Sequence, residues 1–147
     1  METIAKNKKA YFNYDIVEEY VAGIKLEGRE IKSLRTQKPS FAGSFVTISA
    51  GKPQLHELNI SRYKHDGSRE YNPKRKRLLL LKKSEIERID AKLKEKGVTV
   101  VPLEIFIKNN LAKVSLGIVR GRKQYDKRRI IKDREEKRKI QRIMKKY

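Results

Sequence analysis

The sequence predicts a mainly β protein, an OB-like antiparallel barrel of six strands with about three peripheral helices. Three features favour this fold: short apolar segments, turn residues between consecutive segments, and a length of 147 residues that suits one domain with an appendage. Short antiparallel strands in sequential hairpins most economically close into a small barrel, because closure removes unpaired strand edges. An open α+β sheet is the alternative architecture.

The first 40 residues begin with a polar segment, which is followed by alternating apolar and polar side chains. We expect residues 1–10, which contain three lysines, to form an exposed arm. Apolar and polar side chains then alternate over 11–17 and continue in strand style over 20–26. Apolar residues three apart predict a short helix over 29–35, which ends before Pro39.

The middle of the chain predicts a hairpin and a long loop. Strands are expected over 41–49 and 54–60, on either side of a turn at 50–53. The segment 61–77 interleaves seven cations with aromatic residues and contains Gly and Pro, so we expect a long basic loop. Loops of this length in a small domain are usually functional or disordered. A short apolar run at 78–81 predicts another strand.

A helix over 84–96 has signals at both of its ends. Ser84 and Glu87 have the spacing of a capping box, in which the hydroxyl and the carboxylate each satisfy a free backbone amide. Apolar residues recur on one helical face, and Gly97 supplies a left-handed residue after the last turn. This segment is therefore predicted to form a helix that packs against the barrel through one face.

The last part of the barrel is predicted to be a long hairpin. Its strands span 98–108 and 111–119, and the turn lies at Asn109 and Asn110. Pro102 lacks a backbone N–H, so it requires a bulge or an edge position in its strand.

The charge divides the chain into two regions. Residues 120–147 hold 14 Lys or Arg against 4 Asp or Glu, a net charge of +10, and the preceding 119 residues hold 24 against 14, also +10. We therefore expect an OB-like barrel at 1–120 and a basic tail at 121–147. Asp126 is a good helix N-cap, but the tail's apolar residues form no continuous stripe and its like charges repel. We expect the tail to be disordered when free and to form the last helix when bound.

A net charge of +20 points to a polyanionic partner. Nucleic acid is favoured because each Lys or Arg that replaces a counterion on a phosphate gains affinity. An anionic membrane surface is the alternative, although no segment approaches the ~20 apolar residues of a membrane span and the N-terminus lacks a signal sequence. The absence of cysteine is compatible with a cytoplasmic location.

Two basic segments are candidates for contact with RNA. Residues 73–77 lie near Tyr63 and Tyr71 in sequence, and cations with aromatic residues on a folded body suit structured RNA. In the tail, Tyr125 can stack on an unpaired base while Arg128 binds phosphate or guanine. The alternatives are a solvated loop and a Tyr125 that packs on the barrel.

The sequence gives little support to an enzyme. It contains no phosphate-binding Gly loop, zinc-protease motif or nucleophile elbow. His56 lies in a predicted strand and His65 in the loop. Glu18, Glu19 and Glu30 could bind Mg²⁺ in a nuclease, but their spacing is ordinary. We predict no catalytic residue, no cofactor and no metal site.

Five blocks that span nearly the whole chain carry a resemblance to a known family. They are IAKNKKA at 4–10, AGIKLEGREIKSLR at 22–35, PKRKRLLLL at 73–81, KGVTVVPL at 96–103 and GRKQYDKR at 121–128. Each block alone is weak, but five in the right order are highly specific. With these five blocks in order, the chain resembles the SsrA-binding protein family, or small protein B, the bacterial partner of tmRNA in trans-translation.

The resemblance implies a barrel that binds the tRNA-like domain of tmRNA as a monomer. It also implies a tail that enters the decoding centre of a ribosome stalled on truncated mRNA and extends along the empty mRNA path. The implied tmRNA-binding residues are Asn7, Lys8, Lys32, Arg75, Arg77, Leu80 and Lys82. The implied contacts to ribosomal RNA at the decoding centre are Gly121, Arg122, Lys123, Tyr125, Asp126, Lys127 and Arg128. The alternative is a generic ribosomal or ribosome-assembly OB-fold protein.

Three positions depart from the pattern of that family. Val21 stands where the family usually has an acid, which puts one contact of the RNA surface in doubt. Leu78 occupies a position that is commonly Lys. Arg122 replaces the usual Lys, which keeps the charge but alters the hydrogen-bond geometry.

Overall fold

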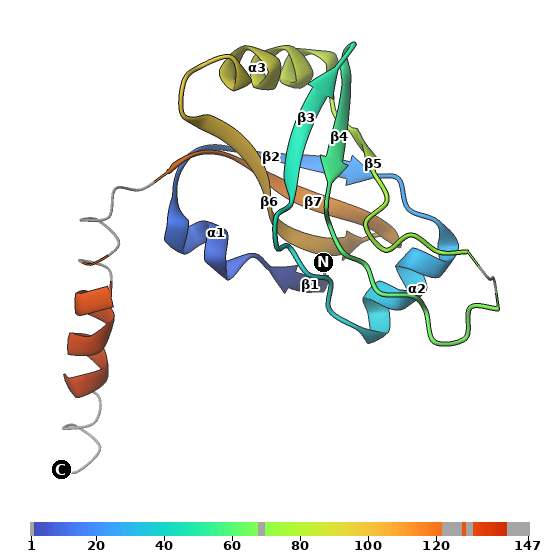
Figure 1. Cartoon of the computed structure of the whole chain (residues 1–147), viewed down its shortest axis with the longest axis horizontal. Helices are drawn as coiled ribbons and strands as arrows, with labels where there is room; N and C mark the ends of the chain where they lie inside the picture. The colour runs from blue at the N-terminus through green and yellow to red at the C-terminus, as the bar shows by residue number, and fades with distance from the viewer. Residues whose placement is uncertain (1, 68–69, 122–127, 129–130, 141–147) are drawn as a thin grey trace.

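The computed structural model describes residues 2–67, 70–121, 128 and 131–140, and it is mainly β as predicted (Figure 1). Seven strands form one antiparallel sheet, so the expected number of six is wrong by one. The strands are β1 (Glu2–Lys6), β2 (Tyr14–Ile24), β3 (Phe45–Ser49), β4 (Lys52–His56), β5 (Arg77–Leu80), β6 (Val98–Lys108) and β7 (Leu111–Gly121). The helices within the described residues are α1 (Lys8–Asn13), α2 (Gly28–Thr36), α3 (Lys83–Leu93) and residues 131–140.

The sheet curls around a single main core. Its strand order is β1-β6-β7-β2-β5-β4-β3, and β3 at the far end packs back against β6. Helix α3 lies at one end of the curled sheet and α2 at the other (Figure 1). Ile89 of α3 and Leu34 of α2 are buried in the same cluster as Leu55, Leu116 and Ile118 of the strands. The helices therefore close the two ends of the barrel.

The N-terminal segment is not the exposed arm that the sequence predicted. Residues 2–6 pair with β6, from Glu2 opposite Ile107 to Lys6 opposite Glu104. Residues 11–13, expected in a strand, belong instead to α1, which buries Ala10 against the outer face of the sheet. Polar side chains on an edge strand carry little local signal, so only the pairing with β6 reveals β1.

The β6–β7 hairpin matches its prediction closely. Asn109 and Asn110 have φ values of 52° and 62°, the left-handed conformation that a tight hairpin turn requires and that Asn tolerates. The register shifts between Pro102 and Glu104, which is the predicted bulge. Opposite this region, a Cβ atom on Gly117 would lie 2.7 Å from Cδ1 of Leu103, so the sheet leaves no room for a side chain there.

The helix ends differ in detail from the predictions. Helix α2 covers the expected 29–35, but the capping box predicted at Ser84 is wrong. Instead, the backbone N–H of Lys82 donates to Oε1 of Glu85 at 3.0 Å, so α3 begins one residue earlier and ends at Leu93. Among the helices that the structure describes, none combines the length and apolar character needed to cross a membrane.

Candidate nucleic-acid interface

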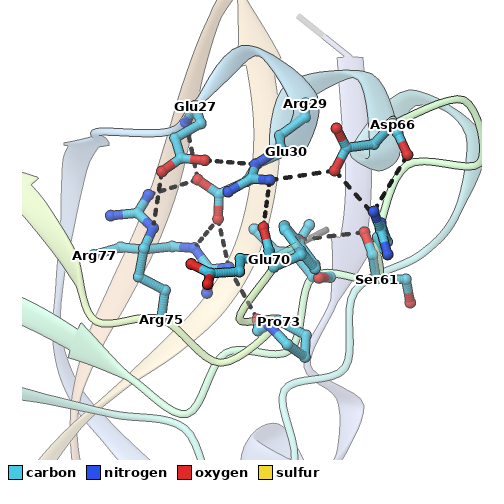
Figure 2. Close-up of polar contacts among 12 residues, drawn as sticks. Glu27, Arg29, Glu30, Ser61, Asp66, Glu70, Pro73, Arg75 and Arg77 are labelled. Atoms are coloured by element: carbon cyan, nitrogen blue, oxygen red, sulfur yellow. Dashed lines mark hydrogen bonds and ion pairs between the residues drawn. The ribbon is translucent and has the colours of Figure 1, made fainter. Parts of the chain in front are cut away.

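A buried carboxylate anchors the basic loop to α2 (Figure 2). Glu30, in the first turn of α2, has no exposed surface. Its Oε1 accepts from Nη2 of Arg75 at 2.5 Å, and its Oε2 accepts from Nε of Arg77 at 2.7 Å. The backbone N–H of Glu27 donates to Oε1 at 2.8 Å. One side chain thus fixes both cations at the end of the loop.

Hydrogen bonding, rather than burial, determines the ionisation of Glu30. Burial raises the pKa of this carboxyl group, because the charged form is poorly solvated in the interior. The hydrogen bonds from the Glu27 backbone, Arg75 and Arg77 outweigh burial and hold the pKa of Glu30 below its ordinary value. Glu30 is therefore the negative centre of an ionic cluster.

The structure corrects the expectation for Arg77. Its side chain is fully buried, and the guanidinium also donates to the carbonyl oxygens of Leu58 at 2.6 Å and Pro73 at 2.9 Å. A direct contact between Arg77 and RNA does not fit this placement. Arg75, by contrast, keeps 37% of its side chain exposed. Arg77 supports the surface, and Arg75 lies on it.

Arg29 holds the other part of the loop. Its Nη1 lies 3.2 Å from Oδ2 of Asp66 and donates to the carbonyl oxygen of Glu70 at 2.9 Å. The guanidinium also lies over the ring of Tyr71, 4.9 Å from its centroid. The Tyr71 hydroxyl donates to the carbonyl oxygen of Ile60. The described part of the loop is therefore tied to α2 at several points rather than freely solvated.

Exposed cations and aromatic rings surround this anchored loop. Lys32 is exposed on α2, and its Nζ lies 5.8 Å from the ring centroid of Tyr63. Tyr63 packs edge-on against His65, with their ring centroids 5.4 Å apart. Lys32 of α2 and Arg75, which is bonded to Glu30 of α2, are thus both exposed cations beside this helix.

Leu80 and Lys82 form a second part of the same side of the barrel. Leu80 pairs with Gly23 of β2, and the missing Cβ of Gly23 lets Leu80 lie across the strand, since an added Cβ would be 3.3 Å from Cβ of Leu80. Leu80 and Val21 are 52% and 53% exposed. Lys82 follows β5 and is exposed. Exposed aliphatic groups beside a cation are suited to contact ribose or a base edge.

Asn7 and Lys8, at the start of α1, lie beside β6. The Nδ2 of Asn7 donates to the carbonyl oxygen of Pro102 in β6 at 2.8 Å, and its Oδ1 accepts from the N–H of Ala10 at 3.2 Å. Strands β7 and β2 lie between β6 and β5 in the sheet, so Asn7 is bonded to a strand that is not a neighbour of β5. The expected tmRNA-binding residues therefore come from non-adjacent strands of the sheet.

A groove of about 650 Å³ borders Asn7 and Lys8. Its other wall consists of residues 40–45, a loop that leads into β3 at the exposed aromatic residue Phe45. The sequence predicts a strand from residue 41, but β3 begins only at Phe45, and the uncharged residues before it carry no motif that indicates a role.

Most of the predicted decoding-centre residues lie outside the described residues. Only two are described: Gly121, which ends β7 and is exposed, and Arg128, which is exposed. The others are Arg122, Lys123, Tyr125, Asp126 and Lys127. Residues 131–140 form a helix with exposed side chains, and Arg134 lies 5.7 Å from the ring centroid of Phe12 in α1.

The carboxylates that a nuclease would need do not gather in the described part of the chain. Oε1 of Glu18 accepts from Nη2 of Arg88 at 2.8 Å, whereas the two oxygens of Glu30 accept from Arg75 and Arg77. Within the described residues, no group of three or more Asp, Glu or His side chains is placed to hold a metal ion. This arrangement does not favour the nuclease alternative.

Comparison with known proteins gives one consistent result. The model of the family described as SmpB protein matches residues 4–146. The SsrA-binding protein of Treponema denticola is 45% identical over 99% of this chain and 94% of the relative, and that of Aquifex aeolicus is 47% identical over 97% and 91%. A solved structure described as "tmRNA-SmpB: a journey to the center of the bacterial ribosome" is 42% identical, with a TM-score of 0.72, over 84% of this chain and 87% of that one.

Proposed function

Because the chain belongs to the SmpB protein family, we propose that it binds tmRNA and delivers it to stalled ribosomes. The barrel binds the tRNA-like domain of tmRNA. The C-terminal tail occupies the decoding centre and the empty mRNA path of a ribosome that has reached the end of a truncated message. The protein thus acts in trans-translation and ribosome rescue, in the cytoplasm, as a monomeric adaptor that binds RNA and catalyses no reaction.

The observation that carries this proposal is the extent of the family match. It covers residues 4–146 and therefore includes both the barrel and the basic tail. A generic ribosomal protein with an OB-like barrel would share the barrel alone, so the match favours the adaptor over that alternative. The solved tmRNA-SmpB relative has the same fold at a TM-score of 0.72, and its description names tmRNA and the bacterial ribosome.

The assignment of tmRNA to the barrel and of the decoding centre to the tail rests on the charges and contacts of these two regions. In the barrel, we assign the tmRNA-facing surface to Lys32, Arg75, Leu80 and Lys82, with Arg77 as internal support and with Asn7 and Lys8 beside β6. We assign seven tail residues to the decoding centre: Gly121, Arg122, Lys123, Tyr125, Asp126, Lys127 and Arg128. A basic segment that neutralises phosphates suits a narrow RNA channel, whereas a rigid surface suits a folded RNA.

Removal of residues 121–147 tests this division. The truncated protein should keep most of its affinity for the tRNA-like domain at raised salt, where non-specific phosphate binding fades. It should lose peptide tagging on ribosomes stalled at the end of a truncated mRNA. The full chain is the matched control in both assays. Loss of affinity for the tRNA-like domain upon truncation would contradict the assignment of that RNA to the barrel.

A further inference from the structure

The groove between α1 and the loop 40–45 has the chemistry of a nucleotide site. Lys6, Lys8 and Lys9 border it, and all three are exposed. Within the part of the chain that the structure describes, none of the three ammonium groups forms an ion pair, and no Asp or Glu borders the groove. The groove therefore attracts anions along one wall.

The opposite wall offers an aromatic platform. Phe45 of β3 pairs with His56 of β4, and their rings stack with centroids 4.9 Å apart and an angle of 9° between planes. The Oγ1 atom of Thr47 and Nε2 of His56 are hydrogen-bonded at 2.6 Å, which fixes the orientation of the imidazole. His56 stacks on the Phe45 ring, and Phe45 remains 39% exposed and is one of the residues that border the groove.

Hydrogen bonds hold both walls in place. On the side of α1, Asn7 bonds to Pro102 and Ala10. On the other side, the hydroxyl of Ser44 donates to the carbonyl oxygen of Phe41 at 2.6 Å, and the backbones of Ser40 and Asn59 exchange two hydrogen bonds. The groove is therefore formed before any ligand binds, so binding costs little reorganisation.

We propose that this groove binds an unpaired RNA nucleotide, with the base stacked on Phe45 and the phosphate near Lys8 and Lys9. An exposed ring backed by a second ring is a rigid surface for a base, and such stacking tolerates any base because every base has a π face. The lysines supply the sequence-independent attraction for phosphate. A volume of about 650 Å³ accommodates a nucleotide. This proposal rests on the proposed function and gives the adaptor a second RNA contact.

Nuclear magnetic resonance of the full chain with pentauridylate tests the groove directly. The ring protons of Phe45 and His56 should shift upfield on titration, and Phe45→Leu should weaken pentauridylate binding by about fivefold or more. Tyr11→Leu is the matched control, because Tyr11 is an aromatic residue of nearly the same exposure, 38% against 39%, and does not border the groove. Unchanged ring resonances at saturation, or equal affinity of Phe45→Leu and the wild type, would overturn the proposal.

Crosslinking from the groove identifies the source of the nucleotide. Phe45 replaced by p-benzoylphenylalanine should crosslink either to the tRNA-like domain of tmRNA or to ribosomal RNA in purified small subunits. Crosslinks to neither RNA would overturn the proposal. The affinity of Phe45→Leu for the tRNA-like domain at raised salt is measured separately. If the wild type fails to bind that RNA, the adaptor function fails, whereas the pentauridylate result still decides the nucleotide site.

Discussion

The Nη2 atom of Arg77 lies 2.5 Å from Oε2 of Glu30, and the two side chains are 0% and 1% exposed. This ion pair joins α2 to the start of β5 across 47 residues of sequence. Removing two charges from water is costly, so the pair is stable only because further donors and acceptors satisfy its remaining polar atoms. The ion pair thus fixes the end of the basic loop that leads into β5.

Replacing Glu30 with Gln should lower the free energy of unfolding by about 3 kcal/mol, because the buried guanidinium of Arg77 then lacks a counter-charge. Urea denaturation measures the change. Glu18→Gln is the control. It removes the ion pair with Arg88, whose side chain is 63% exposed, so it should change the urea midpoint little. Equal midpoints for Glu30→Gln and the wild type would show that the buried pair contributes nothing.

The same pair predicts a pH dependence of stability. The pKa of Glu30 is held below its ordinary value of 4.5, so the unfolded chain binds more protons than the folded chain in this range. The contribution of Glu30 is fully present above about pH 5 and is lost as the pH falls through the lowered pKa. The difference in unfolding free energy between the wild type and Glu30→Gln should therefore shrink on acidification. A difference that grows below that range would contradict the assigned direction.

The packing of the β6–β7 hairpin predicts that adding a side chain at Gly117 destabilises the protein. A Cβ atom there would lie 2.7 Å from Cδ1 of Leu103, which is fully buried. Gly117→Ala should destabilise the protein by about 1–3 kcal/mol through overpacking, as measured by thermal or urea unfolding. Gly28→Ala is the control, because an added Cβ meets nothing within 4 Å at that position. A fully stable Gly117→Ala variant would mean that Leu103 moves aside at no cost.

Local chemistry made parts of this fold predictable. Asn109 and Asn110 can adopt a left-handed backbone, and Pro102 cannot donate to a ladder, so a turn and a bulge followed from single residues. Strand β1 was missed because its pairing with β6 is a long-range event. The helical α1 was missed although Asn7, a good N-cap residue, directly precedes it.

The candidate site was less predictable than the fold. The sequence places Arg77 in a run of cations, and a run of cations is normally solvated. Its burial depends on Glu30, which lies 47 residues away and was considered only as a possible Mg²⁺ ligand. Likewise, Phe45 becomes part of a groove only because β3 curls back toward β6 and α1 covers the outer face of the sheet. Such juxtapositions arise from tertiary structure, and no local pattern carries them.

The assignment of Lys82 to the tmRNA-facing surface predicts a change in salt dependence. Lys82→Ala should weaken binding of the tRNA-like domain and lower the slope of log K against log salt by about 1, because one phosphate contact is lost. Lys108→Ala removes an exposed cation from the end of β6 and should leave the slope unchanged. If both variants lower the slope equally, the RNA contact is spread over the whole protein rather than localised beside Leu80.

We expect the basic tail to fold into a helix when it binds RNA. The side chains of residues 131–140 are all exposed, so burial of an apolar face contributes little to that helix. Pairs of acid and base at i and i+4, such as Glu135 with Lys139, add only about 0.3 kcal/mol each. A peptide of residues 120–147 should therefore show little helix by circular dichroism in dilute buffer and should gain helix when RNA neutralises its charge. A strongly helical free peptide would contradict coupled folding and would make the tail a rigid element that enters the ribosome preformed.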